Sequence, residues 1–210
     1  MKIEQIDVGL FRILVPFEDE IATTVYVVLE GRKVVLIDSA TKESDVDQFI
    51  FPALREIGVT TDQIAFLLLT HSHLDHAGGA TGILRRLPGV QLRASFRMDH
   101  PRYTCLRDGE IVFERLQTLL LPGHTEDSLG FFDLRTKTLL SGDCLQLKGI
   151  GKYRNGISFP RQYRQSIERL KKMDICRIVA AHEYDPLGSV AQGKREVLEY
   201  LQACLDFHSI

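Results

Sequence analysis

The chain has 210 residues, of which 44% are hydrophobic and 26% are charged, and its formal net charge is −2. This length and composition predict one sizeable hydrophobic core, with two small cores as the alternative, in a single domain over residues 1–210. The near-neutral charge gives no positive field for nucleic acid, and no apolar run is long enough to span a membrane, so we expect neither as a partner.

The first half of the sequence alternates between strand and helix patterns. Residues 23–30 and 33–38 are typical of two paired strands. Apolar residues recur at helical spacing over 43–57, which predicts a helix. The apolar run 64–69 predicts a buried strand, and residues 78–87 predict a second helix.

The second half repeats this organisation with shorter strands. Strands are expected to dominate residues 90–143, with an irregular stretch at 98–105. A helix is expected to begin near Pro160, a residue favoured at helix starts. Val197, Leu201 and Leu205 mark a C-terminal helix. Because the sequence contains no linker and each half combines strands with helices, it favours an α/β fold.

Residues 70–79 read Thr-His-Ser-His-Leu-Asp-His-Ala-Gly-Gly and directly follow the predicted strand 64–69. Imidazole and carboxylate groups together suit zinc, and they also suit iron or manganese. His71 and His73 can both reach one metal ion from an irregular loop, while Asp75 and His76 can turn toward a second. Structural zinc sites rely on cysteine, and none lies nearby in sequence, so we expect an open, reactive site.

Three further apolar runs each lead to a potential metal ligand. The runs 116–121, 138–140 and 176–181 precede His124, Asp143 and His182, respectively. Each run is typical of a short strand. Together with the strand before His71, they predict a shared rim at a sheet edge.

These residues resemble the metallo-β-lactamase-fold superfamily of metallohydrolases. The resemblance rests on the His-x-His-x-Asp-His block at 71–76 and on the order of the later histidines and aspartate, and it covers about residues 10–185. It extends to Asp38 after a strand and to residues 106–110. The chain departs from the family pattern at Ala40 and Ala181, where the family usually has glycine.

The resemblance implies a four-layer αββα sandwich with metals at one edge between the sheets. It also implies two divalent metal ions, with zinc expected and iron or manganese suitable. The implied ligands are His71, His73 and His124 for the first ion, Asp75, His76 and His182 for the second, and Asp143 as a bridge. A metal-bridging hydroxide would be the nucleophile, and Asp75 would orient it or pass a proton to the leaving group.

The implied activity is dinuclear metal-dependent hydrolysis of a small molecule with an ester, thioester, lactone or phosphoester bond. Asp143 argues against a common zinc β-lactamase, which lacks the bridging aspartate, and Gln146 stands where acyl-homoserine lactonases have tyrosine. Glyoxalase II enzymes carry an extra C-terminal helical region. The residues that follow His182 in this sequence are too few to form it. An iron-dependent oxidoreductase resembling persulfide dioxygenases and a non-catalytic metal-binding module stay as alternatives. The sequence leaves the oligomeric state open.

The four cysteines are widely spaced and form no Cys-x-x-Cys pair. Together with an N-terminus that carries acids where a signal peptide would be apolar, this favours reduced thiols in a cytoplasmic protein. Cys144 directly follows Asp143, but we favour packing over metal ligation for its side chain.

The segment 146–159 follows the Asp143 strand and is expected to form a wall of the site. Its cations Lys148, Lys152 and Arg154 could hold an anionic group of the substrate, although a solvated surface loop is an equal alternative. Weaker candidate site residues are Tyr184, His100 and Tyr103, and the remaining histidine, His208, is expected at the surface.

Overall fold

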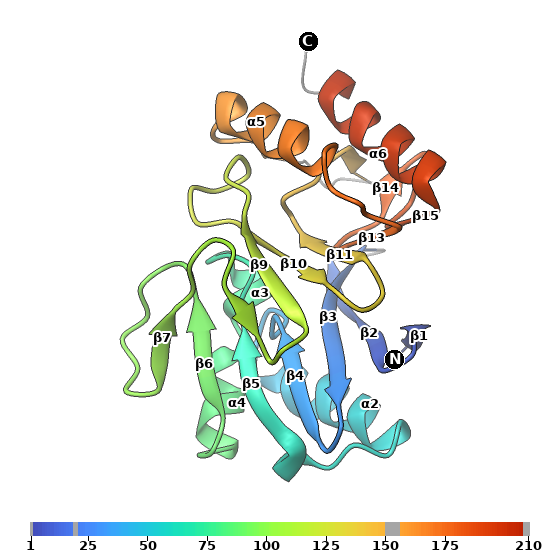
Figure 1. Ribbon diagram of the computed structural model, residues 1–210. Helices are drawn as coiled ribbons and strands as arrows, with labels where there is room; N and C mark the ends of the chain where they lie inside the picture. Colours follow the sequence, from blue (N-terminus) through green and yellow to red (C-terminus); the bar gives the residue numbers. More distant parts are fainter. Residues whose placement is uncertain (1, 19–20, 150–155, 208–210) are drawn as a thin grey trace. The chain divides into compact units, whose positions relative to one another are not determined.

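The computed structural model describes residues 2–18, 21–149 and 156–207 (Figure 1). Contacts divide the chain into two compact units, Met1–Leu106 and Arg107–Ile210. Each unit has one main sheet with helices packed on it, as expected for an α/β protein. The single domain predicted from the sequence stays a prediction.

The first unit contains a seven-stranded sheet in the order β1-β2-β3-β4-β5-β6-β7. Its strands are β1 (Lys2–Asp7), β2 (Leu10–Glu18), β3 (Ile21–Glu30), β4 (Lys33–Ile37), β5 (Ile64–Leu68), β6 (Gln91–Ala94) and β7 (Tyr103–Cys105). Strands β1 to β4 are antiparallel, and β4 to β7 are parallel. The predicted pair 23–30 and 33–38 is confirmed as β3 and β4. The prediction that residues 98–105 are irregular is wrong for the last three of them. These residues form β7, which pairs with β6, and Tyr103 packs against the core.

One continuous helical segment follows β4 and confirms the helix predicted at 43–57. It consists of α1 (Glu43–Asp45), a π-helical turn (Val46–Ile50) and α2 (Phe51–Glu56). Val46, Ile50 and Leu54 recur on one face of this segment and are buried in the core of the first unit. A short 3₁₀ turn (Thr61–Gln63), α3 (Leu74–Ala77) and α4 (Ala80–Arg86) complete the helices described in this unit.

The second unit contains a six-stranded sheet in the order β15-β13-β11-β10-β9-β8. The strands are β8 (Ile111–Val112), β9 (Leu116–Leu120), β10 (Leu129–Asp133), β11 (Thr138–Gly142), β13 (Arg177–Ala180) and β15 (Val190–Gln192), and β12 (Lys148–Gly149) pairs with β14 (Tyr184–Asp185) in a separate ribbon. β10 runs antiparallel to both β9 and β11, and β11 is parallel to β13. The carboxyl ends of β9, β11 and β13 therefore lie at the same edge of the sheet.

Helices α5 (Pro160–Leu170) and α6 (Lys194–Phe207) confirm the two helices predicted for the second half, and Figure 1 shows them in orange and red. Tyr163, Ile167 and Leu201 from these helices are buried with sheet residues such as Ile178 in a core separate from that of the first unit. Each sheet thus buries one face under its own helices.

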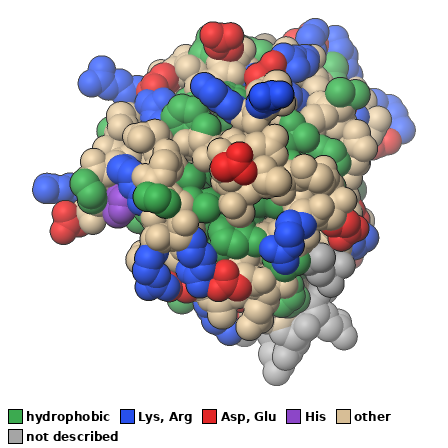
Figure 2. Space-filling view, turned by 90° about the horizontal axis from the view of Figure 1, so that it is seen from below, with side chains coloured by type: hydrophobic (Ala, Val, Ile, Leu, Met, Phe, Trp, Pro, Cys, Tyr) green, Lys and Arg blue, Asp and Glu red, His purple; other side chains and the backbone are tan. Residues whose placement is uncertain are grey.

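The surface carries both signs of charge. On the face drawn in Figure 2, Lys and Arg side chains are interspersed with Asp and Glu side chains, as the net charge of −2 suggests. Among the residues that the structure describes, no helix is both long and apolar enough to cross a membrane.

Candidate metal centre

The histidine block of the first unit lies in the turn that leaves β5. His71 and His76 are buried, Asp75 is half-buried and His73 is exposed. The ring centroid of His71 lies 4.7 Å from that of His73 and 4.2 Å from that of His76. A carboxylate oxygen of Asp75 lies 3.3 Å from Nε2 of His76. The turn therefore gathers the predicted donors of this unit within a few ångströms.

A buried carboxylate at the end of β4 orients this cluster. Asp38 accepts hydrogen bonds from the backbone N–H of Thr70 at 2.8 Å and from its hydroxyl, also at 2.8 Å. Nδ1 of His76 lies 2.7 Å from Oδ2 of Asp38. A proton on Nδ1 would be donated to this carboxylate, which leaves the Nε2 lone pair for a metal ion.

The chain around Asp38 adopts an uncommon backbone conformation. Asp38 has a φ of 66° and Ala40 a φ of 60°, both in the left-handed region. The N–H of Ser39 donates a hydrogen bond to the carbonyl of His76 at 2.7 Å, and the Ser39 hydroxyl donates to the same oxygen at 2.8 Å. These bonds fasten the turn after β4 to α3 and hold the conformation in place.

Two glycines make this close approach possible. A Cβ atom on Gly78 would lie 1.9 Å from the carbonyl oxygen of Thr41, and one on Gly79 would lie 2.0 Å from that of Ser39. Neither distance is compatible with a side chain. The Gly-Gly pair after the histidine block is therefore required by the packing of this turn, in addition to any role in starting α4.

The second unit brings its three predicted ligands together at the edge defined by β9, β11 and β13. His124 and His182 are both buried, as is Asp143. Oδ2 of Asp143 lies 3.5 Å from Nε2 of His124, and Oδ1 lies 3.4 Å from Nε2 of His182. The shared rim expected from four strand ends is thus confirmed for three strands, while β5 belongs to the sheet of the first unit.

Sequence reasoning missed the role of Gln146, which it noted as the residue that replaces a tyrosine and as the first residue of the predicted wall segment 146–159. Its side chain is buried, with Nε2 lying 2.8 Å from Nδ1 of His124 and 3.4 Å from Oδ2 of Asp143. Its Oε1 accepts a hydrogen bond from the N–H of Gly156 at 2.9 Å. No sequence signal identifies such a residue, because glutamine is common and these partners lie far apart along the chain.

The other candidates are placed as follows. Cys144 packs in the hydrophobic core of the second unit, as we favoured. Tyr184 is buried in the same core. Nδ1 of His100 accepts a hydrogen bond from the backbone N–H of Arg102 at 3.2 Å. Burial raises the pKa of Tyr103 to about 12, so its phenol stays protonated at neutral pH.

The predicted anion-binding segment is described only in part. Lys152 and Arg154 lie outside the described residues, as does His208. Nζ of Lys148 lies 3.1 Å from a carboxylate oxygen of Asp185, and both side chains are exposed to solvent. Lys148 thus makes a surface ion pair, which contributes little to stability.

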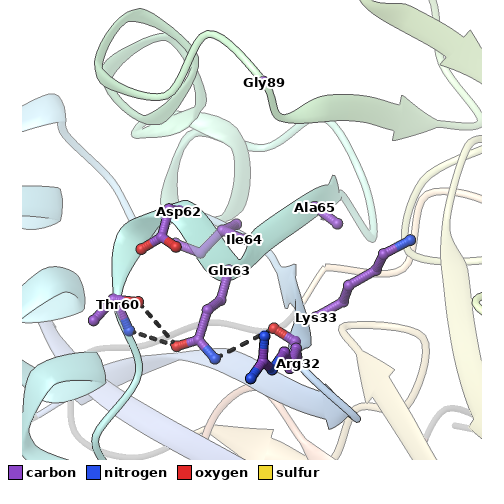
Figure 3. A pocket seen from close by; sticks show the side chains of 8 residues that line it. All are labelled: Arg32, Lys33, Thr60, Asp62, Gln63, Ile64, Ala65 and Gly89. Atoms are coloured by element: carbon purple, nitrogen blue, oxygen red, sulfur yellow. Dashed lines mark hydrogen bonds between the residues drawn. The ribbon is translucent and has the colours of Figure 1, made fainter.

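A surface pocket in the first unit lies at the amino end of β5, whereas the histidine block follows its carboxyl end (Figure 3). Gln63 accepts a hydrogen bond from the N–H of Thr60 at 2.8 Å and donates one to the carbonyl of Arg32 at 3.3 Å. The residues that line this pocket include none of the predicted ligands.

The donors in each unit fit divalent transition metals. Imidazole nitrogen and carboxylate oxygen are the preferred ligands of zinc in catalytic sites, and they also bind iron and manganese. His76 is held by the Asp38 carboxylate, and Nδ1 of His124 contacts the carbonyl oxygen of Gly156. Such outer partners are typical of metal-bound histidines, because they fix the ring and its tautomer.

Comparison with known proteins identifies the family. The model of the metallo-beta-lactamase superfamily matches residues 19–104, which include Asp38 and the whole histidine block. The chain belongs to the metallo-beta-lactamase superfamily. Membership of this superfamily implies binding of divalent metal, and it confirms the resemblance drawn from the sequence.

Two curated relatives extend the match into the second unit. The chain is 32% identical over 164 residues to a hydroxyacylglutathione hydrolase of Prochlorococcus marinus, with 74% of this chain and 62% of the relative covered. It is 26% identical over 169 residues to a beta-lactamase-like protein 2 homolog of Caenorhabditis elegans, with 76% of this chain and 55% of the relative covered. The chain therefore spans little more than half the length of these relatives.

Solved structures confirm the predicted fold class. A metallo-beta-lactamase family protein from Thermus thermophilus has a TM-score of 0.75 at 21% identity, with 97% of this chain and 80% of that chain covered. A metallo beta lactamase from Hirschia baltica has a TM-score of 0.76 at 18% identity, with 99% and 97% covered. This metallo-beta-lactamase superfamily member thus has the αββα sandwich fold of its superfamily.

Proposed function

We propose that the chain is a metal-dependent hydrolase whose seven predicted ligands hold two divalent metal ions. The ligand set is the one that the family resemblance implies: His71, His73, Asp75, His76, His124, Asp143 and His182. The observation that carries this proposal is the position of Asp143 in the second unit. Its two carboxylate oxygens each lie within 3.5 Å of a different buried imidazole, as a residue that bridges two ions requires.

The proposal also concerns the identity of the metal. Zinc is our first choice, because catalytic zinc sites combine several histidines with a carboxylate. No cysteine is needed in this ligand set, and Cys144 is buried in the apolar core next to Asp143. Iron and manganese accept the same donors, so the metal must be identified by measurement.

In this proposal, some residues would take part in proton transfer and others would orient the metal ligands. When bound, divalent metal ions lower the pKa of a coordinated water and polarise the bond under attack. Asp75 is partly accessible, and its carboxylate lies next to His76, so it can accept a proton and pass it to the leaving group. Asp38 and Thr70 hold the ring of His76 and keep its Nε2 available as a ligand.

The proposed substrate is a small molecule with an ester or thioester bond. Curated relatives named hydroxyacylglutathione hydrolase support an acyl compound as the first class to test. Lactones and phosphoesters are the next classes to test, because two-metal sites can activate water for attack on a carbonyl carbon or on a phosphorus atom. The surrounding charge gives no reason to expect nucleic acid as a substrate.

Two other functions stay compatible with the same donors. An iron-dependent oxidoreductase would use the histidine and carboxylate ligands with a redox-active metal. A non-catalytic metal-binding module would retain the metal without turnover. Metal identification and assays of hydrolysis therefore separate the three functions.

The proposal is tested with protein purified without chelators and assayed on a panel of esters, thioesters, lactones and phosphodiesters. We expect hydrolysis that is lost on metal removal and restored by zinc. Asp143→Ala should lower the rate by more than the roughly 10–100-fold typical for loss of an outer partner.

Cys144→Ser is the matched control, because it alters the buried residue directly after Asp143. It should retain most of the activity and the full metal content. The assignment would be wrong if Cys144→Ser abolished turnover while Asp143→Ala left it unchanged.

A further inference from the structure

Gln146 occupies a position that packing alone does not explain. The residues on either side of it, Leu145 and Leu147, are apolar and buried in the core of the second unit. Gln146 itself is fully buried, although glutamine carries a polar amide that is costly to bury without hydrogen bonds. Its amide must therefore be held by specific partners.

The partners of the amide fix its orientation. Oε1 accepts the N–H of Gly156 at 2.9 Å, so the oxygen faces the main chain of that residue. The nitrogen then faces the cluster, at 3.4 Å from Oδ2 of Asp143, and can donate a hydrogen bond to this carboxylate. One amide thus connects Asp143 with the main chain of Gly156.

Gly156 continues this connection to His124. The carbonyl oxygen of Gly156 contacts Nδ1 of His124, and a carbonyl can only accept a hydrogen bond. The amide nitrogen of Gln146 lies 2.8 Å from the same Nδ1, so both groups hold the ring from this side and leave Nε2 of His124 facing Asp143. Because Gln146 holds the N–H of Gly156, it also sets the position of the carbonyl that orients His124.

The main chain of Gln146 is fixed independently of its side chain. The Tyr163 hydroxyl accepts the N–H of Gln146 at 3.0 Å and donates to its carbonyl at 3.1 Å. Burial raises the pKa of Tyr163 well above its usual value, so this hydroxyl stays protonated and can donate. Helix α5 thereby anchors the base of the side chain while the amide reaches the cluster.

We propose that Gln146 is a positioning residue for the metal centre, which orients His124 through Gly156 and restrains the Asp143 carboxylate directly. This inference rests on the proposed metal-binding function and adds a determinant outside the ligand set. Loss of an outer partner of this kind typically weakens metal binding by about 10–100-fold.

The test measures metal binding without reference to turnover. Zinc affinity is determined for the unmodified protein and for Gln146→Leu by competition with a chromophoric chelator, and the Co²⁺-loaded forms are compared by absorption spectroscopy. We expect the zinc Kd to rise about 10–100-fold and the Co²⁺ bands to shift, because His124 and Asp143 lose their restraint. Should Gln146→Leu fail to fold, Gln146→Met, which is unbranched and also lacks the amide, takes its place.

Two controls separate positioning from simple stability. Gln117→Leu makes the same chemical change at a half-buried glutamine on β9 and should leave zinc affinity unchanged. Tyr200→Phe removes a hydroxyl from the same core, where it donates to the carbonyl of Gly188 at 3.2 Å, and should lower the melting temperature with little effect on zinc affinity.

The outcomes distinguish the two levels of the proposal. If the unmodified protein binds no zinc, iron or manganese, the proposed function fails. If it binds zinc and the Gln146 variant binds equally well with the same Co²⁺ spectrum, only the role of Gln146 is refuted. Equal weakening by Tyr200→Phe would also refute it, since the effect would then follow from lost stability.

Discussion

At the scale of single residues, Asp38 and Ala40 show how the turn after β4 is adapted to the cluster that it supports. Asp38 adopts a left-handed conformation and places its carboxylate against Thr70 and His76. Ala40 has the same left-handed conformation, but its methyl group cannot make a polar contact that would offset the strain. It stands where the family usually has glycine. An alanine in the left-handed region has an unfavourable contact between its Cβ and the backbone.

We therefore predict that Ala40→Gly stabilises the protein by about 0.5–1 kcal/mol, because glycine adopts a φ of 60° without that contact. Urea denaturation measures the change in the free energy of unfolding. Ala53→Gly, within α2, is the control and should cost about 1–2 kcal/mol through lost helix propensity and the lost burial of its methyl group. A loss of stability in Ala40→Gly would show that the alanine methyl group contributes more by packing than it costs in strain.

The residues of the site were predictable to different extents. Histidine and aspartate after apolar runs carry a chemical signal, so all the proposed ligands could be named from the sequence. Asp38 was noted only through the family resemblance, and its contacts with Thr70 and His76 required the structure. Gln146 could not be found, because its role depends on a contact with Gly156 ten positions later that no local pattern encodes.

At the scale of elements, the ends of strands and one short helix position the donors. His71 lies three positions after the end of β5, while Asp75 and His76 lie on α3, which has only four residues. Such a short helix is not stable by itself, so its position depends on hydrogen bonds to neighbouring elements. Thr23 of β3 donates to the carbonyl of Asp75 at 3.1 Å, and Ser39 donates to that of His76.

The contact between α3 and the turn after β4 leads to a prediction for Gly79. Gly79→Ala should destabilise the protein by about 2–3 kcal/mol, because its Cβ would lie 2.0 Å from the Ser39 carbonyl oxygen. It should also weaken metal binding, since the displaced turn carries Asp38. Thermal denaturation and zinc titration measure the two effects.

Gly89→Ala provides the control, as a Cβ there would meet no atom within 4 Å. Its stability should stay within about 0.5 kcal/mol of the unmodified protein. If both variants behaved alike, the close approach at Gly79 would be of no consequence for the fold.

Long periodic segments were predicted better than short strands. The spacing of Val46, Ile50 and Leu54 identified the helical segment after β4, because several turns repeat the same pattern. Strand β7 has three residues and lies within a stretch that we expected to be irregular. Its pairing with β6 is a long-range contact, and three residues are too few to show alternation.

At the scale of the whole molecule, the two units have separate hydrophobic cores. None of the four cysteines, all of which lie among the described residues, forms a disulfide. Cys105 is exposed, whereas Cys144 and Cys204 are buried in the core of the second unit. Stability therefore rests on apolar burial within each unit and on any metal that binds.

Thiol labelling should report on the core of the second unit. Burial raises the pKa of Cys204 to about 12, so its reactive thiolate is scarce at pH 8 as well as shielded. We predict fast labelling of Cys105 and labelling of Cys204 only as fast as the second unit opens. Mass spectrometry of labelled peptides measures both rates, with Cys105→Ser removing the fast phase. Rapid modification of Cys204 in the native protein would contradict the burial described for α6.

The central claim is that one chain holds two divalent metal ions through its seven histidine and aspartate ligands. Native mass spectrometry, combined with elemental analysis of protein purified without chelators and then saturated with zinc, tests this claim most directly. We predict two ions per chain in the unmodified protein and fewer than two in Asp143→Ala, which lacks the bridging carboxylate. A saturated protein that holds a single ion, or an Asp143→Ala variant that retains two ions with unchanged affinity, would contradict the account.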